Sequence, residues 1–482
     1  MTRKRMLPML ALMAALSLVT AACGQKANVS NLASGGGGGS GGGDDAAAGL
    51  EVGETTEDGK VVVGFDAQGK AILADADSEE AQAVLGGKTP TSSRGGTTAT
   101  TVGGSAAPTT KVWGNTITIG VHAPITGAAP LPSSFQDAVT FVKNHYNAKG
   151  GVHGRQLEIV IEDDQYQPAI ATQRCTEMVK GKNAFLLIGA AGTDQIQACA
   201  RWAASAGVPY LSAGVTEKGL TTLKNYFAIS MSYKAQMPYV VKYMKETFPT
   251  KASDPSKAFM VYSDTPNFGD AVSAWKDAFP GAQTLRLPRV PSQGDLNAAA
   301  RELCTKGVQV ALPLMAPSNW LFLIGQMTCT PQWAGIGVTM GINEVAKNGC
   351  RAAGRNFTGA RFFSPFPNTD KAPAMDPEFK AAIGNTTKWD DIWVALWGTT
   401  KGMVQILDKV GPELTRAKFV TTAENTKGLA TGLSPVLNFS PTNHFGANET
   451  HVLEASCTGS ADGLGNYPQG GKYTTPTTFL KY

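Results

Sequence analysis

A glycine-rich loop after a predicted strand has the composition of an anion-binding site. Gly189 to Gly192 follow an apolar run that ends at Ile188, and Thr193 stands where the next helix is expected to begin. The first amides of a helix lack partners within the helix, and with the helix dipole and a hydroxyl they bind an anion such as a carboxylate. The alternative is that Thr193 only caps its own helix. This loop is therefore a candidate for holding the anionic end of a ligand.

Motifs typical of enzymes are not convincing in this chain. Residues 38–42 match G-x-S-x-G, but a nucleophile elbow needs a strand before it and a helix after it, and this segment is glycine-rich throughout. The G-x-G at residues 335–337 is no dinucleotide fingerprint, because Met340 occupies the third glycine position. There is no Walker loop and no C-x-x-C, and the five histidines do not stand beside the cysteines. We expect no catalysis, no cofactor and no metal, with an envelope hydrolase the least favoured class.

The first 22 residues have the layout of a secretory signal. Three basic residues at positions 3–5 precede an apolar run over residues 7–19, which is too short to span a membrane. The segment TAACG at residues 20–24 resembles the bacterial lipobox, in which the cysteine is diacylated, although threonine stands where leucine is usual. The alternative is an ordinary signal that leaves a free thiol. We expect residues 1–22 to be a lipoprotein signal peptide and lipid on Cys23 to hold the protein at the membrane surface.

Residues 23–112 are expected to form a lipidated linker. The segment from 24 to 111 has no Trp or Tyr, one aromatic residue (Phe65), and a nearly all-glycine run at 35–43. Such a composition cannot bury enough apolar surface to offset the entropy of ordering. Residues 60–65 and 70–73 resemble a short hairpin, and 78–85 could make a helical turn or two, but such a piece is marginal alone.

Six cysteines remain in the body beside Cys23, and an even number in an exported chain indicates disulfides, with 15 possible pairings. The first two are 24 residues apart and the next two 25, about one strand–helix repeat, so each pair could join neighbouring helices. The last two are then left over. Spacing does not fix the connectivity, and zinc is the rival interpretation. The candidates are Cys175, Cys199, Cys304, Cys329, Cys350 and Cys457.

Charge and hydropathy bound the function further. Removing the three basic residues of the signal from 42 leaves 39 Lys and Arg against 38 Asp and Glu, and no basic run follows residue 5. This balance excludes a typical nucleic-acid binder. The remaining body of about 370 residues is too long for one compact core and suits two domains.

The elements that must position the candidate loop alternate between strand and helix. The first series has apolar runs at 117–121, 157–161, 185–188 and 208–211, with helical periodicity between them. The second has strands at 258–262, 284–290, 308–312 and 333–338 and helices at 268–279, 295–306 and 318–327. Such alternation implies parallel sheets in two α/β lobes. Ligands bind beyond the carboxyl ends of such strands, so two facing edges make a cleft.

Three segments carry a family resemblance: IGVHAPITG at 119–127, GGVHGRQLEIVIEDD at 150–164 and AGVP at 206–209. They resemble the branched-chain amino-acid-binding family of ABC-transporter substrate-binding proteins, from about residue 116 to near 467. The resemblance implies a type I periplasmic-binding fold, α/β in class. In it, two lobes of three-layer α/β/α sandwich are joined by a three-crossover hinge that closes on the ligand. By analogy, lobe 1 takes 113–234 and 360–440, and lobe 2 takes 235–359 and 441–482.

The resemblance also implies ligand-binding positions. Thr193 matches the family serine that holds the ligand carboxylate, and Thr216 lies in a loop that meets the substituents of the α-carbon. Phe268 stands where the family normally has tyrosine. The alternatives are loop hydrogen bonding for Thr216 and core packing for Phe268. The full set of candidates is Thr126, Ala191, Gly192, Thr193, Gly214, Val215, Thr216, Phe268 and Met315.

One departure from the family pattern bears on the ligand. The family commonly supplies an acid near residues 335–340 to pair with a ligand ammonium, and this chain has none before Glu344. A buried ammonium without a carboxylate or several acceptors is costly. Either Asp264 or another acid substitutes, or the ligand is not a plain α-amino acid.

We therefore expect an extracytoplasmic lipoprotein that captures a small amphipathic ligand and delivers it to an ABC permease. A branched-chain amino acid is the first expectation, followed by amides and small carboxylates. The alternative is a sensor of the same fold that passes the ligand signal to a membrane partner.

Overall fold

The computed structural model describes residues 60–65, 71–75, 78, 113–336, 342–353, 357, 359–369, 371–386, 388–455, 457, 473–474 and 479–481. The chain divides into two compact units between residues 100 and 101. The expected signal peptide, the lipid site at Cys23 and the turns expected after Ser78 lie outside the described residues, as do residues 337–341.

The first unit contains the predicted hairpin. Strands β1 (Lys60–Phe65) and β2 (Ala71–Asp75) pair antiparallel, with Lys60 opposite Asp75 and Phe65 opposite Ala71. The register shifts between Val62 and Gly64. The hairpin expected from the sequence is therefore confirmed.

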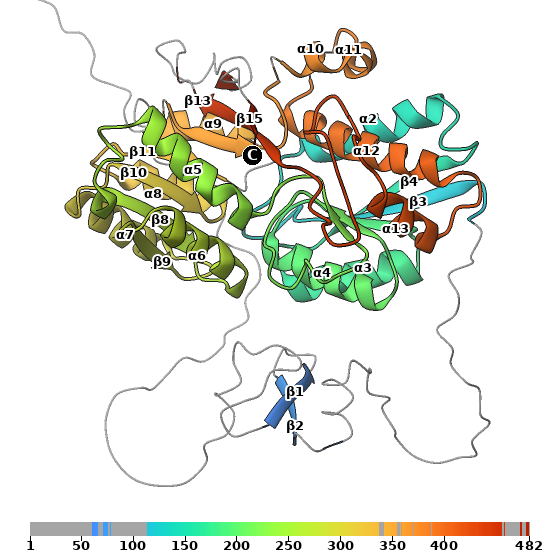
Figure 1. Ribbon diagram of the computed structural model, residues 1–482, viewed down its shortest axis with the longest axis horizontal. Helices are drawn as coiled ribbons and strands as arrows, with labels where there is room; N and C mark the ends of the chain where they lie inside the picture. Colours follow the sequence, from blue (N-terminus) through green and yellow to red (C-terminus); the bar gives the residue numbers. More distant parts are fainter. Residues whose placement is uncertain are drawn as a thin grey trace, which may run out of the picture. The chain divides into compact units, whose positions relative to one another are not determined.

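Lobe 1 is built on a five-stranded parallel sheet whose strand order is β4-β3-β5-β6-β7. Its strands are β3 (Thr116–Ala123), β4 (Gln156–Asp163), β5 (Leu186–Gly189), β6 (Tyr210–Ser212) and β7 (Tyr226–Ala228). Its helices are α2 (Ser134–Ala148), α3 (Pro168–Lys180), α4 (Thr193–Ser205), α10 (Ala372–Met375), α11 (Pro377–Ile383), α12 (Asp391–Val410) and α13 (Arg416–Glu424). Figure 1 shows α2 and α12 on one side of β3 and β4, and α3 and α4 on the other.

Alternation along β5 explains these two layers. Leu186 and Ile188 pack into the core that contains α2 and α12, whereas Leu187 packs into the core that contains α3 and α4. Successive side chains of a strand point to opposite faces, so a strand buried on both faces is a continuous apolar run. This is why the short run at 185–188 predicted a buried strand.

Lobe 2 has a larger mixed sheet with the path β14-β13-β12-β11-β10-β8-β9. Strands β8 to β12 are parallel, and β13 runs antiparallel to β12, β14 and β15. The strands are β8 (Ala258–Ser263), β9 (Gln283–Leu287), β10 (Val310–Leu314), β11 (Gln332–Gly335), β12 (Arg361–Ser364), β13 (Glu449–Ala455), β14 (Tyr473–Thr474) and β15 (Phe479–Lys481). The helices are α5 (Tyr233–Thr247), α6 (Gly269–Ala278), α7 (Gln293–Thr305), α8 (Pro317–Gln326) and α9 (Ile342–Ala353), with short 3-10 turns η1 (Pro255–Lys257) and η2 (Pro266–Phe268).

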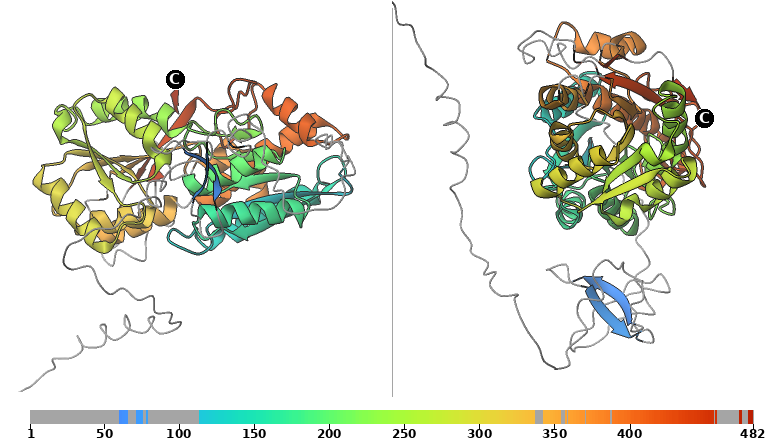
Figure 2. Two further views of the ribbon diagram at one scale, coloured as in Figure 1. Left: turned by 90° about the horizontal axis from the view of Figure 1, so that it is seen from below. Right: turned by 90° about the vertical axis from the view of Figure 1, so that its left-hand side faces the viewer.

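The chain passes between the two sheets three times: after β7, after β12 and before β13. Figure 2 shows the resulting lobes side by side, with the last crossing segment in red between them. Both lobes have helices on the two faces of a mostly parallel sheet, so the predicted fold class is confirmed.

Two lobe boundaries differ from those expected. Residues 361–364, assigned to lobe 1, form β12 of the lobe 2 sheet, because Phe362 and Phe363 are buried against opposite faces of that sheet. Residues 441–447, assigned to lobe 2, continue lobe 1. There, the amide of Ala228 donates to the carbonyl of His444, and the amide of Gly446 donates back to Ala228.

Three disulfides connect elements within the lobes. Cys175–Cys199 joins α3 to α4, and Cys350–Cys457 joins α9 to the segment after β13. Cys304–Cys329 joins α7 to the bend that follows α8, not to a helix. These are the pairings that the spacing favoured. No helix among the described residues is long and apolar enough to cross a membrane.

Candidate functional site

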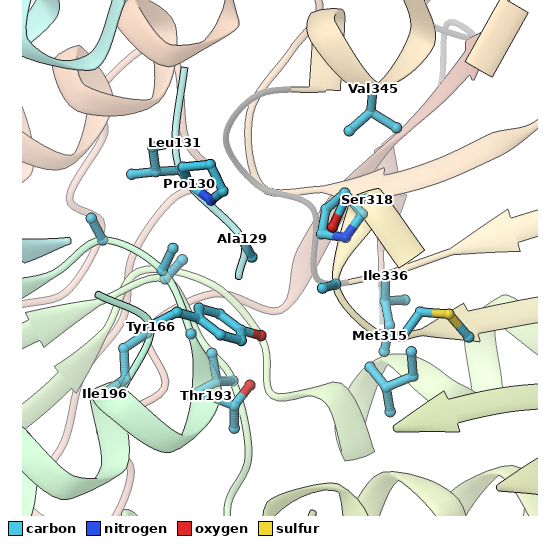
Figure 3. Close-up of a pocket in the computed structure, with 18 of the residues that line it drawn as sticks. Ala129, Pro130, Leu131, Tyr166, Thr193, Ile196, Met315, Ser318, Ile336 and Val345 are labelled. Atoms are coloured by element: carbon cyan, nitrogen blue, oxygen red, sulfur yellow. The ribbon is translucent and has the colours of Figure 1, made fainter. Parts of the chain in front are cut away.

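A cavity of about 300 Å³ opens at the carboxyl ends of strands from both lobes. Lobe 1 supplies the loops after β3, β4, β5 and β6, and lobe 2 supplies η2, the end of β10, α8, the end of β11 and one face of α9. This is where open α/β sheets bind ligands. In Figure 3, Tyr166 and Thr193 lie together at one end of the cavity, and Leu131 and Val345 lie at the other.

Most of the cavity wall is apolar, and its polar side chains are few. Among the lining residues, the apolar ones include Leu131, Ile196, Val215, Phe268, Leu314, Met315, Leu321, Ile336 and Val345. The polar ones are Tyr166, Thr193, Tyr233, Ser318, Glu344 and Asn348. A mainly apolar wall with a few polar groups is typical of small-molecule sites, in which the polar groups fix the orientation of the ligand.

The start of α4 forms the polar end. Gly192 is the N-cap residue of this helix, has φ +84°, and provides no side chain to cap the first amides. A helix start without a side-chain cap leaves its first amides open to an anion. The side chain of Thr193 is 8% exposed and shares a hydrogen bond with Tyr233. Burial raises the pKa of Tyr233 to about 12, although this hydrogen bond opposes the shift, so the phenol stays protonated even well above neutral pH.

Tyr166 adds a second phenol at the same end, and its ring points into the cavity (Figure 3). Its hydroxyl is a donor at neutral pH, as for any tyrosine, and burial and the nearby Asp194 raise the pKa of Tyr166 further. The backbone of Gln165 and Tyr166 is left-handed, with φ of 53° and 59°. Carboxylates hold this turn: Asp163 accepts from the amide of Gln165, and Asp164 accepts from the amide of Tyr166, each at 2.9 Å.

Seven of the nine predicted ligand-binding residues line the cavity: Ala191, Gly192, Thr193, Gly214, Val215, Phe268 and Met315. The other two lie away from it. Thr126 is exposed and donates to Asp163 at 2.6 Å. Thr216 is fully buried and donates to Asp270 at 2.9 Å, because α6 of lobe 2 begins beside its loop.

The two acids weighed in the sequence differ in position. Asp264 does not line the cavity and instead pairs with Arg286 within lobe 2. Glu344 does line it. Its side chain is 46% exposed, and its carboxylate lies 3.4 Å from the ammonium of Lys347 and accepts from the side-chain amide of Asn348 at 3.1 Å. Glu344 and Asn348 are one helical turn apart on α9, a signal that sequence analysis did not use.

Three aspartates connect the lobes around this site. Asp194 of α4 accepts from Thr265 at 2.7 Å, from Asn267, and from Arg289 at 2.7 Å, all three of lobe 2. Asp270 of α6 accepts from the lobe 1 loop at Thr216, and Asp391 of α12 accepts from the amide of Ile342, which begins α9. The described conformation is therefore closed around the cavity.

A second, smaller cavity of about 20 Å³ adjoins the polar end. It shares Tyr166, Thr193, Phe268, Met315 and Ala316 with the larger cavity. Its further lining residues are Asp194, Ser263, Thr265 and Arg289. We refer to it as the polar annex.

One group of His, Cys, Asp and Glu side chains among the described residues has the proximity of metal ligands: His122, Cys175 and Cys199. The two sulfur atoms are bonded to each other, so they are not thiolate ligands. His122 is fully buried, and its ring nitrogens lie 2.8 Å from Asp164 and 2.6 Å from the hydroxyl of Tyr210. This group is a structural network of lobe 1.

A family model described as periplasmic binding protein matches residues 116–461, and the chain belongs to this family. The family and the solved proteins of the same fold are solute-binding proteins and not enzymes, and the family implies an extracytoplasmic location. No curated protein matches the chain by sequence.

Solved structures share the fold at low sequence identity. A fatty acid ABC transporter substrate-binding protein from Thermomonospora curvata has TM-score 0.64 and 19% identity, over 76% of this chain and 93% of that one. A branched-chain amino acid transporter substrate binding protein from Streptococcus pneumoniae, in complex with isoleucine, has TM-score 0.58 and 16% identity, over 75% and 100%. A solute binding protein of an ABC transporter from R. palustris, in complex with benzoate, has TM-score 0.58 and 17% identity, over 75% and 95%.

Proposed function

We propose that this protein is a lipid-anchored receptor that captures a small amphipathic solute between its lobes and delivers it to an ABC permease. The observation that carries the proposal is the cavity at the carboxyl ends of both sheets, with donors at one end and an apolar wall elsewhere. Its volume of about 300 Å³ is at the lower end of the range for small-molecule sites, so the solute is small.

Three solved proteins of the same fold support this choice of chemistry. They are described as a fatty acid transporter protein and as complexes with isoleucine and with benzoate, and these solutes share a carboxylate joined to an apolar body. The start of α4 suits such a carboxylate, and the apolar residues suit the body of the ligand.

A melting-temperature screen tests the binding role. A solute that binds only the folded state stabilises the protein by RT ln(1 + [L]/Kd), about 2.7 kcal/mol at one hundred times Kd. We expect at least one amino acid, aliphatic acid or aromatic acid to raise the melting temperature, and to raise it further as the concentration of the solute increases, as this relation requires. A panel that leaves the melting temperature unchanged at millimolar concentration contradicts the proposal.

Matched variants test the site. Thr193→Val removes a hydroxyl from the polar end, and we expect it to weaken binding about tenfold, the loss of about one good hydrogen bond. Thr399→Val is the control, because its hydroxyl is equally buried but donates to Ala395 within α12. Equal affinities for the two variants would show that the solute binds elsewhere.

The anchor is tested separately. We propose that Cys23 carries the lipid, and Cys23→Ser is expected to move the protein from the membrane fraction to the soluble fraction. A wild-type protein that is soluble after export contradicts the anchor and leaves the binding role intact.

A further inference from the structure

The polar end of the cavity contains many donors and few free acceptors. The donors are the open amides at the start of α4, the hydroxyl of Tyr166, and one of the two hydroxyls of Thr193 and Tyr233, which share a hydrogen bond with each other. Both phenols are protonated at neutral pH, and burial raises the pKa of each further. A ligand group that only accepts hydrogen bonds, such as a carboxylate, is therefore matched on several sides.

The polar annex extends this donor set. The hydroxyl of Ser263 at the end of β8 is buried, with the residue 5% exposed, and it has no hydrogen-bond partner among the described residues. A buried hydroxyl without a partner costs free energy, so it points to a missing partner. The annex has a volume of about 20 Å³, enough for one oxygen atom of a ligand or one water that the ligand holds.

The nearest acid to the polar end is already occupied. Asp194 accepts from Thr265, Asn267 and Arg289, and these three bonds fill three of the roughly four acceptor positions of its carboxylate. The guanidinium of Arg289 also neutralises the negative charge of Asp194. An ammonium group could use Asp194 only by displacing Arg289, the guanidinium that pairs the two lobes.

Three further acceptors of this region are engaged elsewhere or lie apart from the polar end. The hydroxyl of Thr216 donates to Asp270 and lies outside the cavity wall. The carbonyl oxygen of Ala213 accepts from the hydroxyl of Ser212 at 2.7 Å. Glu344 is carried by α9, whose neighbouring residue Val345 lies at the far end of the cavity from Thr193 (Figure 3).

An α-amino acid has its ammonium one carbon away from its carboxylate, so both charged groups must be bound at the same end. Among the described residues that line that end, donors are available for the carboxylate, whereas the carboxylate of Asp194 is already paired with Arg289. We propose, on the basis of the proposed solute-binding function, that the natural ligand is an apolar monocarboxylic acid without an α-ammonium. Its carboxylate lies between the start of α4 and Ser263, and its aliphatic or aromatic body lies along the apolar wall.

Two pairs of probes test this ligand class directly. Leucine differs from 4-methylpentanoate, and phenylalanine from 3-phenylpropanoate, only by the ammonium group. Isothermal titration of the full chain with all four is expected to give at least tenfold tighter binding for the acid of at least one pair. An amino acid that binds as tightly as its partner overturns the inference and leaves the solute-binding function standing.

If none of these four probes binds, the wider melting-temperature panel tests the proposed ligand class instead. A binder that is an acid without an ammonium supports the inference, whereas a binder with an α-ammonium or without an acid group overturns it. If no member of the panel binds, the inference and the proposed function both fail.

Ser263→Ala tests the position of the carboxylate. Because Ser263 has no partner within the described protein, its removal is expected to leave the melting temperature of the ligand-free protein unchanged, and to weaken the bound acid three- to tenfold. Ser205→Ala is the control, since that hydroxyl is exposed on α4 and donates to Trp202. Unchanged affinity in Ser263→Ala places the carboxylate elsewhere and overturns this part of the inference.

Discussion

Replacement of Asp194 by alanine removes the carboxylate that receives three donors across the lobe interface. Thr265 and Asn267 are nearly buried, and each donates to Asp194 from the start of η2. Arg289 approaches from the segment after β9. In an open conformation all these groups return to water, so the variant loses free energy of closure rather than of folding.

The size of this loss follows from the contacts. A hydrogen bond to a charged group contributes about 1.5–3 kcal/mol, so Thr265 and Asn267 together contribute about 3 kcal/mol at the lower limit. The Arg289–Asp194 pair has side chains that are 39% and 15% exposed, so solvent screening reduces it to less than about 1 kcal/mol. A loss of about 3 kcal/mol shifts the ratio of closed to open protein about a hundredfold. Because only the closed state encloses a ligand, the apparent affinity falls by up to the same factor.

Small-angle scattering and titration calorimetry measure the two consequences. We expect the ligand-free Asp194→Ala variant to have a larger radius of gyration than wild type, and its affinity for the tightest solute of the panel to fall 30- to 100-fold. Asp264→Ala is the control, because Asp264 pairs with Arg286 inside lobe 2 and bridges nothing. If Asp194→Ala scatters like wild type and binds within threefold of it, the three contacts do not hold the lobes closed.

Three further predictions concern stability and the cavity loop. Cys350 and Cys457 are 107 residues apart, and the double alanine variant removes their disulfide. Urea denaturation should show a free energy of unfolding about 2–4 kcal/mol lower than that of wild type. An unchanged free energy of unfolding would contradict a stabilising role for this disulfide. Burial lowers the pKa of His451 to about 3, against about 6.5 when unfolded, so only the unfolded state gains this proton. Stability should therefore fall from pH 6.5 toward pH 3, and less steeply in His451→Leu, as chemical denaturation at each pH would show. In Gly214→Ala the new Cβ would lie 2.5 Å from a backbone oxygen, whereas at Gly294 the nearest atom is 3.5 Å away. Titration should show at least tenfold weaker solute binding for Gly214→Ala and unchanged binding for the control Gly294→Ala. Equal affinities for the two variants would contradict the close packing of the loop at Gly214.

Strands β3 to β6 and β8 to β11, and the helix start beside the cavity, could be predicted from the sequence because local patterns determine them, whereas β7 and β12 to β15 were not predicted. The apolar run at 117–121 lies within β3, and the strand expected at 284–290 ends at Leu287, because Pro288 cannot continue the ladder. Gly192 and Thr193 are placed by the strand before them and the helix after them, so their position at a helix start follows from their neighbours in the sequence.

The remaining site residues depend on contacts between distant segments. Tyr166 reaches the cavity because two carboxylates hold its turn in a left-handed conformation, which no periodicity encodes. Thr216 is turned away by Asp270, a residue of the other lobe. Likewise, β12 belongs to lobe 2 because of its neighbours β11 and β13, whereas its own four residues would suit either sheet.

Native mass spectrometry of the protein purified gently from its own cells detects whatever the cavity holds. We expect one small molecule per chain, identified after release as an apolar monocarboxylic acid, and a lower occupancy in Thr193→Val but not in Thr399→Val. An empty cavity in protein that also binds no member of the panel, or a molecule equally retained by both variants, would contradict this expectation.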